Sequence, residues 1–176
     1  MKKWFASLAA VGFLAAAPAL TFAADGTINF TGKITDQACE IDAPNHKIDV
    51  ELGTYSVGQF NGVVGTKTPP IPFVIKLKNC PVVEEGENPH FSIYLTGDSD
   101  AVNKDYLKVT GGAAGVAIVI HDDQGNIVPM NNFTTRKFEV PSANVDLNLI
   151  AYYESTATTI TPGVANGTTD ITFDYR

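Results

Sequence analysis

Histidines and neighbouring carboxylates are the residues of this sequence that could catalyse a reaction or hold a metal ion. The three histidines, His46, His90 and His121, lie in expected loops or at the ends of expected strands. His121 precedes Asp122 and Asp123, a group that could ligate a metal or act as a base, but a lone histidine in an acidic turn is more often solvated. The sequence contains no GxSxG, HExxH or glycine-rich phosphate motif. We therefore predict that the protein is not an enzyme and uses no cofactor.

The first 23 residues have the features of a secretory signal peptide. Met1-Lys2-Lys3 is a positively charged start, an apolar run follows to Leu20, and Ala23 ends a stretch suited to a signal peptidase. No other stretch is long and apolar enough to span a bilayer. We predict cleavage after Ala23 and export of the remaining chain.

Export determines how the two cysteines are interpreted. Cys39 and Cys80 are the only cysteines, and they lie 41 positions apart. An even number of cysteines in an oxidising compartment indicates a disulfide bond, whereas a redox pair needs far closer spacing. We predict a structural Cys39–Cys80 bond, which would stabilise the fold by roughly 4 kcal/mol on the chain-entropy model.

The composition is that of one folded domain of ordinary size. Of the 176 residues, 44% are hydrophobic, 10% are aromatic and 18% are charged, with 12 basic residues against 19 acidic ones. A nucleic-acid surface needs clustered lysine and arginine, but the only basic pairs are Lys2-Lys3 and Arg136-Lys137. We predict no nucleic-acid partner.

Beyond Ala24 the apolar residues alternate with a period of two, the pattern of strands with one face on a core. The run from Val116 to Ile120 is continuously apolar, as in a strand buried on both faces. Turn residues separate these runs, which predicts a single all-β sandwich of the immunoglobulin type. The alternating sets are Ile28, Phe30 and Ile34; Ile48, Val50 and Leu52; Ile71, Phe73, Ile75 and Leu77; Phe91, Ile93 and Leu95; Val145, Leu147, Leu149 and Ala151; and Ile171, Phe173 and Tyr175.

The N-terminal set combines apolar residues with glycine. Gly26, Ile28, Phe30, Gly32 and Ile34 share one parity, so they would form one face of a strand. Glycine weakens a strand within its own sheet but lets another backbone approach closely. The periodicity is equally compatible with a first strand of this sandwich and with a strand that inserts into another molecule.

Four features of the chain after Ala23 have equivalents in one protein family. The run Gly26–Ile34 shortly precedes Cys39, Cys80 follows at the family's spacing, Gly163 is fourteenth from the C-terminus, and Tyr175 is the penultimate residue. In these features the chain resembles the type 1-like fimbrial (pilin) subunits of the chaperone–usher pathway.

The resemblance implies an incomplete immunoglobulin-like β-sandwich, the pilin fold, which is completed by a donor strand from a neighbouring subunit. Residues 1–23 would be the signal peptide, 24–34 the N-terminal donor-strand extension and 35–176 the pilin domain. The extension would donate Gly26, Ile28, Phe30, Gly32 and Ile34 to a neighbour. The implied acceptor groove and chaperone contact comprise Gly163, Ile171, Phe173, Tyr175 and Arg176.

The resemblance also implies the partners. Identical or related pilin subunits would form a head-to-tail polymer, after a periplasmic chaperone has covered the groove and bound the carboxylate of Arg176. An outer-membrane usher would exchange the chaperone for the next subunit, and the fimbria would stand on the bacterial cell surface. The Cys39–Cys80 bond would be required before the chaperone binds.

The place of the subunit in the fibre depends on the extension, which has fifteen residues between Ala23 and Cys39. Short extensions occur in some rod subunits and in minor adaptor subunits. We expect the rod (major) subunit, with a minor tip-adaptor pilin as the alternative. A self-contained secreted β-sandwich binding module, whose first strand completes its own sandwich, is a second function class.

Overall fold

The computed structural model describes residues 28–31, 38–81 and 89–175, and the chain divides into two compact units, residues 1–35 and 36–176. In the smaller unit, residues 28–31 form no regular secondary structure, and the side chains of Ile28 and Phe30 are 79% and 92% exposed. The predicted signal peptide, Gly26, Gly32, Ile34 and Arg176 lie outside the described residues.

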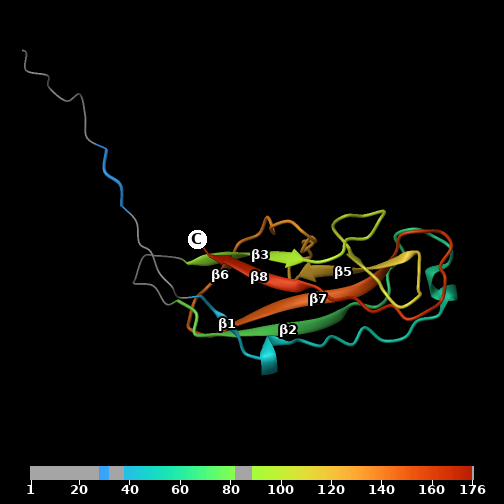
Figure 1. Ribbon diagram of the computed structural model, residues 1–176, viewed down its shortest axis with the longest axis horizontal. Helices are drawn as coiled ribbons and strands as arrows, with labels where there is room; N and C mark the ends of the chain where they lie inside the picture. Colours follow the sequence, from blue (N-terminus) through green and yellow to red (C-terminus); the bar gives the residue numbers. More distant parts are fainter. Residues whose placement is uncertain (1–27, 32–37, 82–88, 176) are drawn as a thin grey trace, which may run out of the picture. The chain divides into compact units, whose positions relative to one another are not determined.

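The larger unit consists of two antiparallel β-sheets (Figure 1). The strand order is β1-β2-β7-β5-β4 in one sheet and β6-β3-β8 in the other, and every pair of named strands is antiparallel. This architecture confirms the prediction of an all-β protein. The elements are β1 (Glu40–Ile41), the 3-10 helices η1 (Pro44–His46) and η2 (Val57–Phe60), β2 (Ile71–Lys78), β3 (His90–Thr96), β4 (Leu107–Lys108), β5 (Val116–Asp122), β6 (Phe138–Glu139), β7 (Val145–Ser155) and β8 (Asp170–Tyr175).

Five strands coincide with predicted apolar runs, namely β2, β3, β5, β7 and β8. Along β5, the residues from Val116 to Val119 are all buried, which confirms a strand covered on both faces. One face of β5 lies on the main core, and the other packs Ala117 and Val119 against Tyr106 and Tyr152. No helix in the described part of the chain is long and apolar enough to cross a membrane.

The predicted disulfide bond joins Cys39 to Cys80. It connects the residue before β1 with a residue two positions after β2, and these two strands pair through Glu40–Lys78 and Ile41–Leu77. The bond therefore holds the edge of the five-stranded sheet at the point where the chain enters the larger unit.

The predicted strand through Ile48, Val50 and Leu52 is wrong. The amide of Asp42 still bonds to the carbonyl of Lys76 at 2.8 Å, but the chain then turns at η1 and leaves the sheet. Ile48 and Val50 are half-buried and Leu52 is buried, so the alternation is real. The backbone of residues 48–55 nevertheless has no hydrogen-bond partner among the described residues. A strand needs a neighbour, and here the inward-facing segment has none.

Candidate functional site: the open side of the sandwich

The strand β8 lies at the edge of the three-stranded sheet. It pairs with β3 in the register Leu95–Ile171, Ile93–Phe173 and Phe91–Tyr175. No strand of the described residues lies on its other side. An edge strand presents backbone N–H and C=O groups that are available to another strand.

The side chains on the inner face of this sheet differ sharply in burial between the two strands. Phe91 and Ile93 of β3 are both 0% exposed, whereas their register partners Tyr175 and Phe173 on β8 are only half-buried. All four point to the same face, because paired residues of adjacent strands share a face. The difference therefore comes from position, since nothing described covers the far side of β8.

The aromatic side chains of β8 are directed into the sandwich. The ring of Phe173 meets the ring of Phe91 nearly edge-on, with centroids 5.1 Å apart, and the ring of Tyr175 lies 5.6 Å from it. The ring of Phe138 on β6 stacks on the other side of Phe91 at 5.5 Å. Such aromatic pairs add about 0.5–1.5 kcal/mol each beyond their buried area. Phe91 thus anchors β8 to the core.

Tyr175 also connects β8 to the disulfide-bonded edge. The amide of Cys39 donates a hydrogen bond to Oη of Tyr175 at 3.0 Å. Burial raises the pKa of Tyr175, although the bond from Cys39 works in the opposite direction. The hydroxyl therefore stays protonated at neutral pH, and it holds the end of β8 beside the start of β1.

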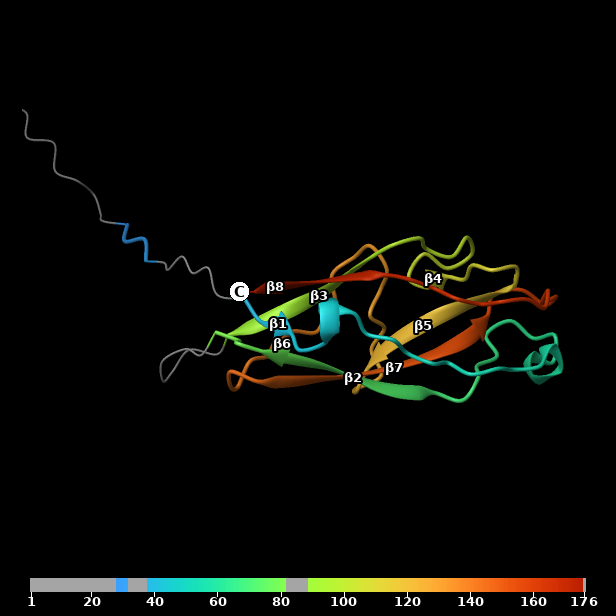
Figure 2. The ribbon, with the colours of Figure 1, turned by 60° about the horizontal axis from the view of Figure 1, so that its bottom comes forward.

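The opposite boundary of the open side is the segment of residues 48–55. Ile48 and Val50 pack against the core from this segment, as Ile171 and Phe173 do from β8. In Figure 2, β8 (red) and this segment (cyan to teal) both follow the length of the sandwich. Two rows of half-buried apolar side chains, each on a backbone with no strand partner on that side among the described residues, are what a missing strand would leave.

The other predicted site residues fall elsewhere. Gly163 precedes β8, and a Cβ atom there would lie 2.5 Å from backbone atoms of Gly112 and Ala113, so only glycine fits this contact. Its observed role is the packing of two loops, and the structure does not place it on the inner face of β8. Ile28 and Phe30 are exposed, and the other predicted donor residues and Arg176 lie outside the described residues.

The acidic turn at the end of β5 is a structural feature. His121 is half-buried, with Nδ1 2.7 Å from the carbonyl oxygen of Gly125 and Nε2 2.8 Å from the hydroxyl of Tyr152, so the prediction of a solvated histidine is wrong. The carboxylate of Asp122 is buried and accepts hydrogen bonds from Asn126. Within the described ranges, no three histidine, cysteine, aspartate or glutamate side chains gather as a metal site would require.

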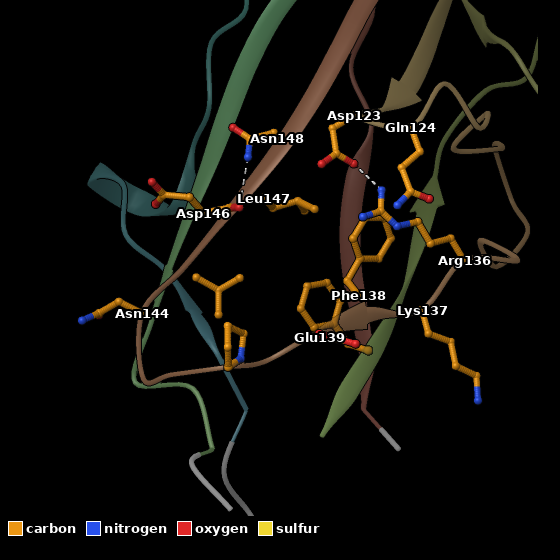
Figure 3. A pocket seen from close by; sticks show the side chains of 13 residues that line it. Asp123, Gln124, Arg136, Lys137, Phe138, Glu139, Asn144, Asp146, Leu147 and Asn148 are labelled. Carbon is orange, nitrogen blue, oxygen red and sulfur yellow. Dashed lines mark hydrogen bonds and ion pairs between the residues drawn. The ribbon is translucent and has the colours of Figure 1, made fainter. Parts of the chain in front are cut away.

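A cavity of about 600 Å³ lies beside β6 and the first half of β7 (Figure 3). The guanidinium of Arg136 lies over the ring of Phe138 at 4.7 Å and forms ion pairs with Asp122 and Asp123. These ion pairs neutralise the positive charge of Arg136, so this guanidinium is not free to recognise an anionic ligand. The open side beside β8 is thus the better candidate for function.

The comparisons with known proteins agree with this architecture. Residues 28–176 match the family model described as "Fimbrial protein". The chain belongs to this fimbrial family. It is 38% identical over 188 residues to the fimbrial-like protein YraH of Escherichia coli strain K12, with 96% of each chain covered. It is 31% identical over 179 residues to the "Probable major fimbrial subunit LpfA" of Escherichia coli O157:H7, covering 100% of this chain and 98% of LpfA.

A solved structure of a chaperone–usher pilus, which addresses the molecular basis of rod uncoiling, has the same fold. It superposes with a TM-score of 0.65 at 21% identity and covers 91% of this chain and 100% of that one. The chain is therefore a fimbrial subunit with the pilin fold, an immunoglobulin-like sandwich that is incomplete. Fimbrial subunits are structural components of bacterial surface appendages rather than enzymes.

Proposed function

We propose that this fimbrial subunit polymerises by donor-strand exchange. The open side between β8 and residues 48–55 accepts the extension of a neighbouring copy, residues 24–34, and its own extension enters the next subunit. The observation that carries this proposal is the contrast in burial between Phe173 or Tyr175 and their fully buried register partners on β3. One further strand would cover these half-buried side chains.

The donor strand would bind through two kinds of contact. Its backbone would bond to the outer edge of β8 and to residues 48–55, which supplies affinity that depends little on sequence. The side chains of Ile28, Phe30 and Ile34 would enter the sandwich, because alternate residues of a strand face one side. A slip of one residue would turn all of them to solvent, so these side chains set the register.

The same open side explains the partners. A subunit alone exposes an unpaired edge and apolar side chains, both of which promote aggregation. A periplasmic chaperone would cover them after export directed by residues 1–23, and an outer-membrane usher would replace the chaperone with the next subunit. A head-to-tail contact of this kind does not close, so its product is a fibre.

We assign the subunit to the rod. The support is its similarity over nearly full length to LpfA, whose name describes a major fimbrial subunit, and to a pilus structure concerned with rod uncoiling. A minor tip adaptor remains the alternative position. The half-burial of Phe173 and Tyr175 supports strand exchange over a self-contained secreted module, whose own strands would cover these side chains.

Thermal unfolding of two chains tests this function. One chain starts at Lys33 and lacks the first nine residues of the extension, and the other adds residues 25–34 behind Arg176 through a flexible linker. We expect a large rise in Tm and solubility for the second chain. A matched third chain, with Ile28 and Phe30 of the added strand changed to serine, should lose most of the rise. A truncated chain that is already monomeric and equally stable would refute strand exchange.

A further inference from the structure

Three loops of the larger unit contain no charged residue. Residues 53–66, 109–115 and 155–169 include no aspartate, glutamate, lysine, arginine or histidine, although the first four types make up 31 of the 176 residues of the chain. At that frequency, these 36 residues would contain about six charges. We call the surface formed by these loops the neutral end.

The three loops are neighbours in space. The amide of Gly65 bonds to the carbonyl of Ser155 at 2.8 Å, which joins the first loop to the third. The amide of Thr156 bonds to Gly115 at 2.8 Å, and that of Thr110 bonds to Asn166 at 2.7 Å, which joins the second loop to the third. In both ribbon views they gather at the end of the sandwich opposite the C-terminus (Figures 1 and 2).

The neutral end presents apolar side chains on a fixed backbone. The buried hydroxyl of Ser155 donates to the carbonyl of Val63 at 2.6 Å and accepts from the amide of Thr66 at 2.9 Å. This pair of bonds holds the turn so that Val63 and Val64 point outward, 58% and 53% exposed. A surface that is already ordered loses little entropy when it binds, which favours its use as an interface.

We propose that the neutral end is a binding surface for the neighbouring copy of this chain, namely the copy whose extension fills the open side. This inference rests on the proposed strand exchange. The strand β8 begins at Asp170, directly after the third loop of the neutral end, and runs away from it. A donor strand antiparallel to β8, like every named strand pair in the sandwich, leaves the open side at the neutral end.

The short segment between the donor strand and the disulfide then requires the two subunits to lie close together. Only four residues separate Ile34, the last apolar residue of the donor strand, from Cys39 at the disulfide of the donating subunit. Five residue steps span at most roughly 18 Å. The base of the donating subunit, which contains β1 and η1, must therefore lie against or close to the neutral end.

The chemistry of the two surfaces fits this contact. Charged residues are depleted at the centres of protein interfaces, because desolvating an unpaired charge is costly. The neutral end has no charge to desolvate. On the base, Lys78 pairs with Asp42 at 2.9 Å, so this charged pair meets the contact already neutralised.

Photo-crosslinking in assembled fibres tests whether the neutral end contacts the base of a second copy. The photoreactive residue p-benzoyl-phenylalanine replaces Val63 in the full chain, which is expressed with its chaperone and usher. In a matched control it replaces Val102, because this side chain is 70% exposed but lies outside the neutral end. We expect residue 63 to crosslink to residues 38–47 of a second copy and residue 102 not to reach that segment. Fibres in which residue 63 forms no crosslink to this segment would overturn the inference.

A pair of charge variants gives an independent readout. Val63→Lys with Val64→Lys should lower the number of fibres per cell several-fold and make their subunits dissociate at lower temperature, whereas Val102→Lys should match the wild type. The Tm of the chain with its appended donor strand should stay unchanged in both, since the side chains are exposed. Wild-type fibre number and heat resistance in the double variant would overturn the inference. A failure of strand exchange itself would appear instead as no rise in Tm when the donor strand is appended to the unmodified chain.

Discussion

The strands β3 and β8 are paired residue by residue and carry the same apolar alternation, yet only on β3 are the inward-facing side chains fully buried. Phe91, Ile93 and Leu95 are enclosed, while Tyr175, Phe173 and Ile171 opposite them remain half-exposed. The inward-facing rows of the two strands are both apolar and aromatic, and they differ in what lies beyond them. Among the described residues, β3 has a neighbouring strand on both sides and β8 on one. An apolar strand face can therefore specify an intramolecular core or an interface, depending on its place in the sheet.

If the proposed strand exchange holds, β3 stabilises the isolated subunit while β8 contributes fully only in the polymer. Burial of apolar area contributes about 25 cal/mol per Å². The part of Phe173 that stays exposed would contribute nothing of this kind until a donor strand covers it. Under the proposed strand exchange, the subunit would retain part of its stabilising free energy for assembly.

The largest expected effect comes from the aromatic anchor. In the chain that lacks the extension, Phe91→Ala should cost about 3–5 kcal/mol of unfolding free energy, as for other buried phenylalanines, and Phe173→Ala roughly half of that. In the chain with the appended donor strand, the cost of Phe173→Ala should rise toward that of Phe91→Ala. Denaturant unfolding of all four variants measures this change.

An equal loss of unfolding free energy for Phe173→Ala with and without the donor strand would contradict the inferred difference between β3 and β8, because the donor strand would then not cover Phe173. Ile75→Ala on β2 is a control for changes in the core that do not depend on the donor. Ile75 is buried in the core and pairs with Leu147 on β7, so its cost should be the same in both chains.

The next effect concerns the edge opposite β8. Cys39→Ala removes the bond that fixes β1 to β2, with an expected loss of about 2–4 kcal/mol. We expect a lower yield of the periplasmic chaperone complex, because the β1–β2 edge, from which the chain continues to residues 48–55, is no longer held. The double variant with Cys80→Ala excludes effects of the unpaired thiol. A normal amount of complex in both variants would show that the chaperone does not require the bond.

The main strands of the fold could be predicted because each is long enough to show its period. The strands β2, β3, β5, β7 and β8 have six to eleven residues, whereas β1, β4 and β6 have two each and leave no periodic signal. The segment at Ile48, Val50 and Leu52 shows the opposite error. Its alternation correctly indicates that one face is turned to the core. A strand, however, is defined by hydrogen bonds to a neighbouring strand, and the alternation does not predict those bonds.

The site could be predicted only in part for the same reason. Alternation placed Ile171, Phe173 and Tyr175 on one face, but their half-exposure depends on a missing neighbour that no local pattern records. The contact between Gly163 and Gly112 and the hydrogen bonds of Ser155 join residues far apart in the chain. The absence of charge from three separate loops became meaningful only when the fold brought them to one end.

The smallest expected effect isolates the hydrogen bond that joins the end of β8 to the disulfide-bonded edge. Tyr175→Phe keeps the ring that packs on Phe91 and removes the oxygen that accepts from the Cys39 amide, for a loss of about 1 kcal/mol. Tyr94→Phe is the matched control, because Tyr94 lies on the opposite face of the same sheet and packs on Phe133. We expect the control to change stability by less than about 0.5 kcal/mol. Equal losses in the two variants would mean that the end of β8 is held by aromatic packing alone, and that the disulfide-bonded edge and β8 contribute to the open side independently.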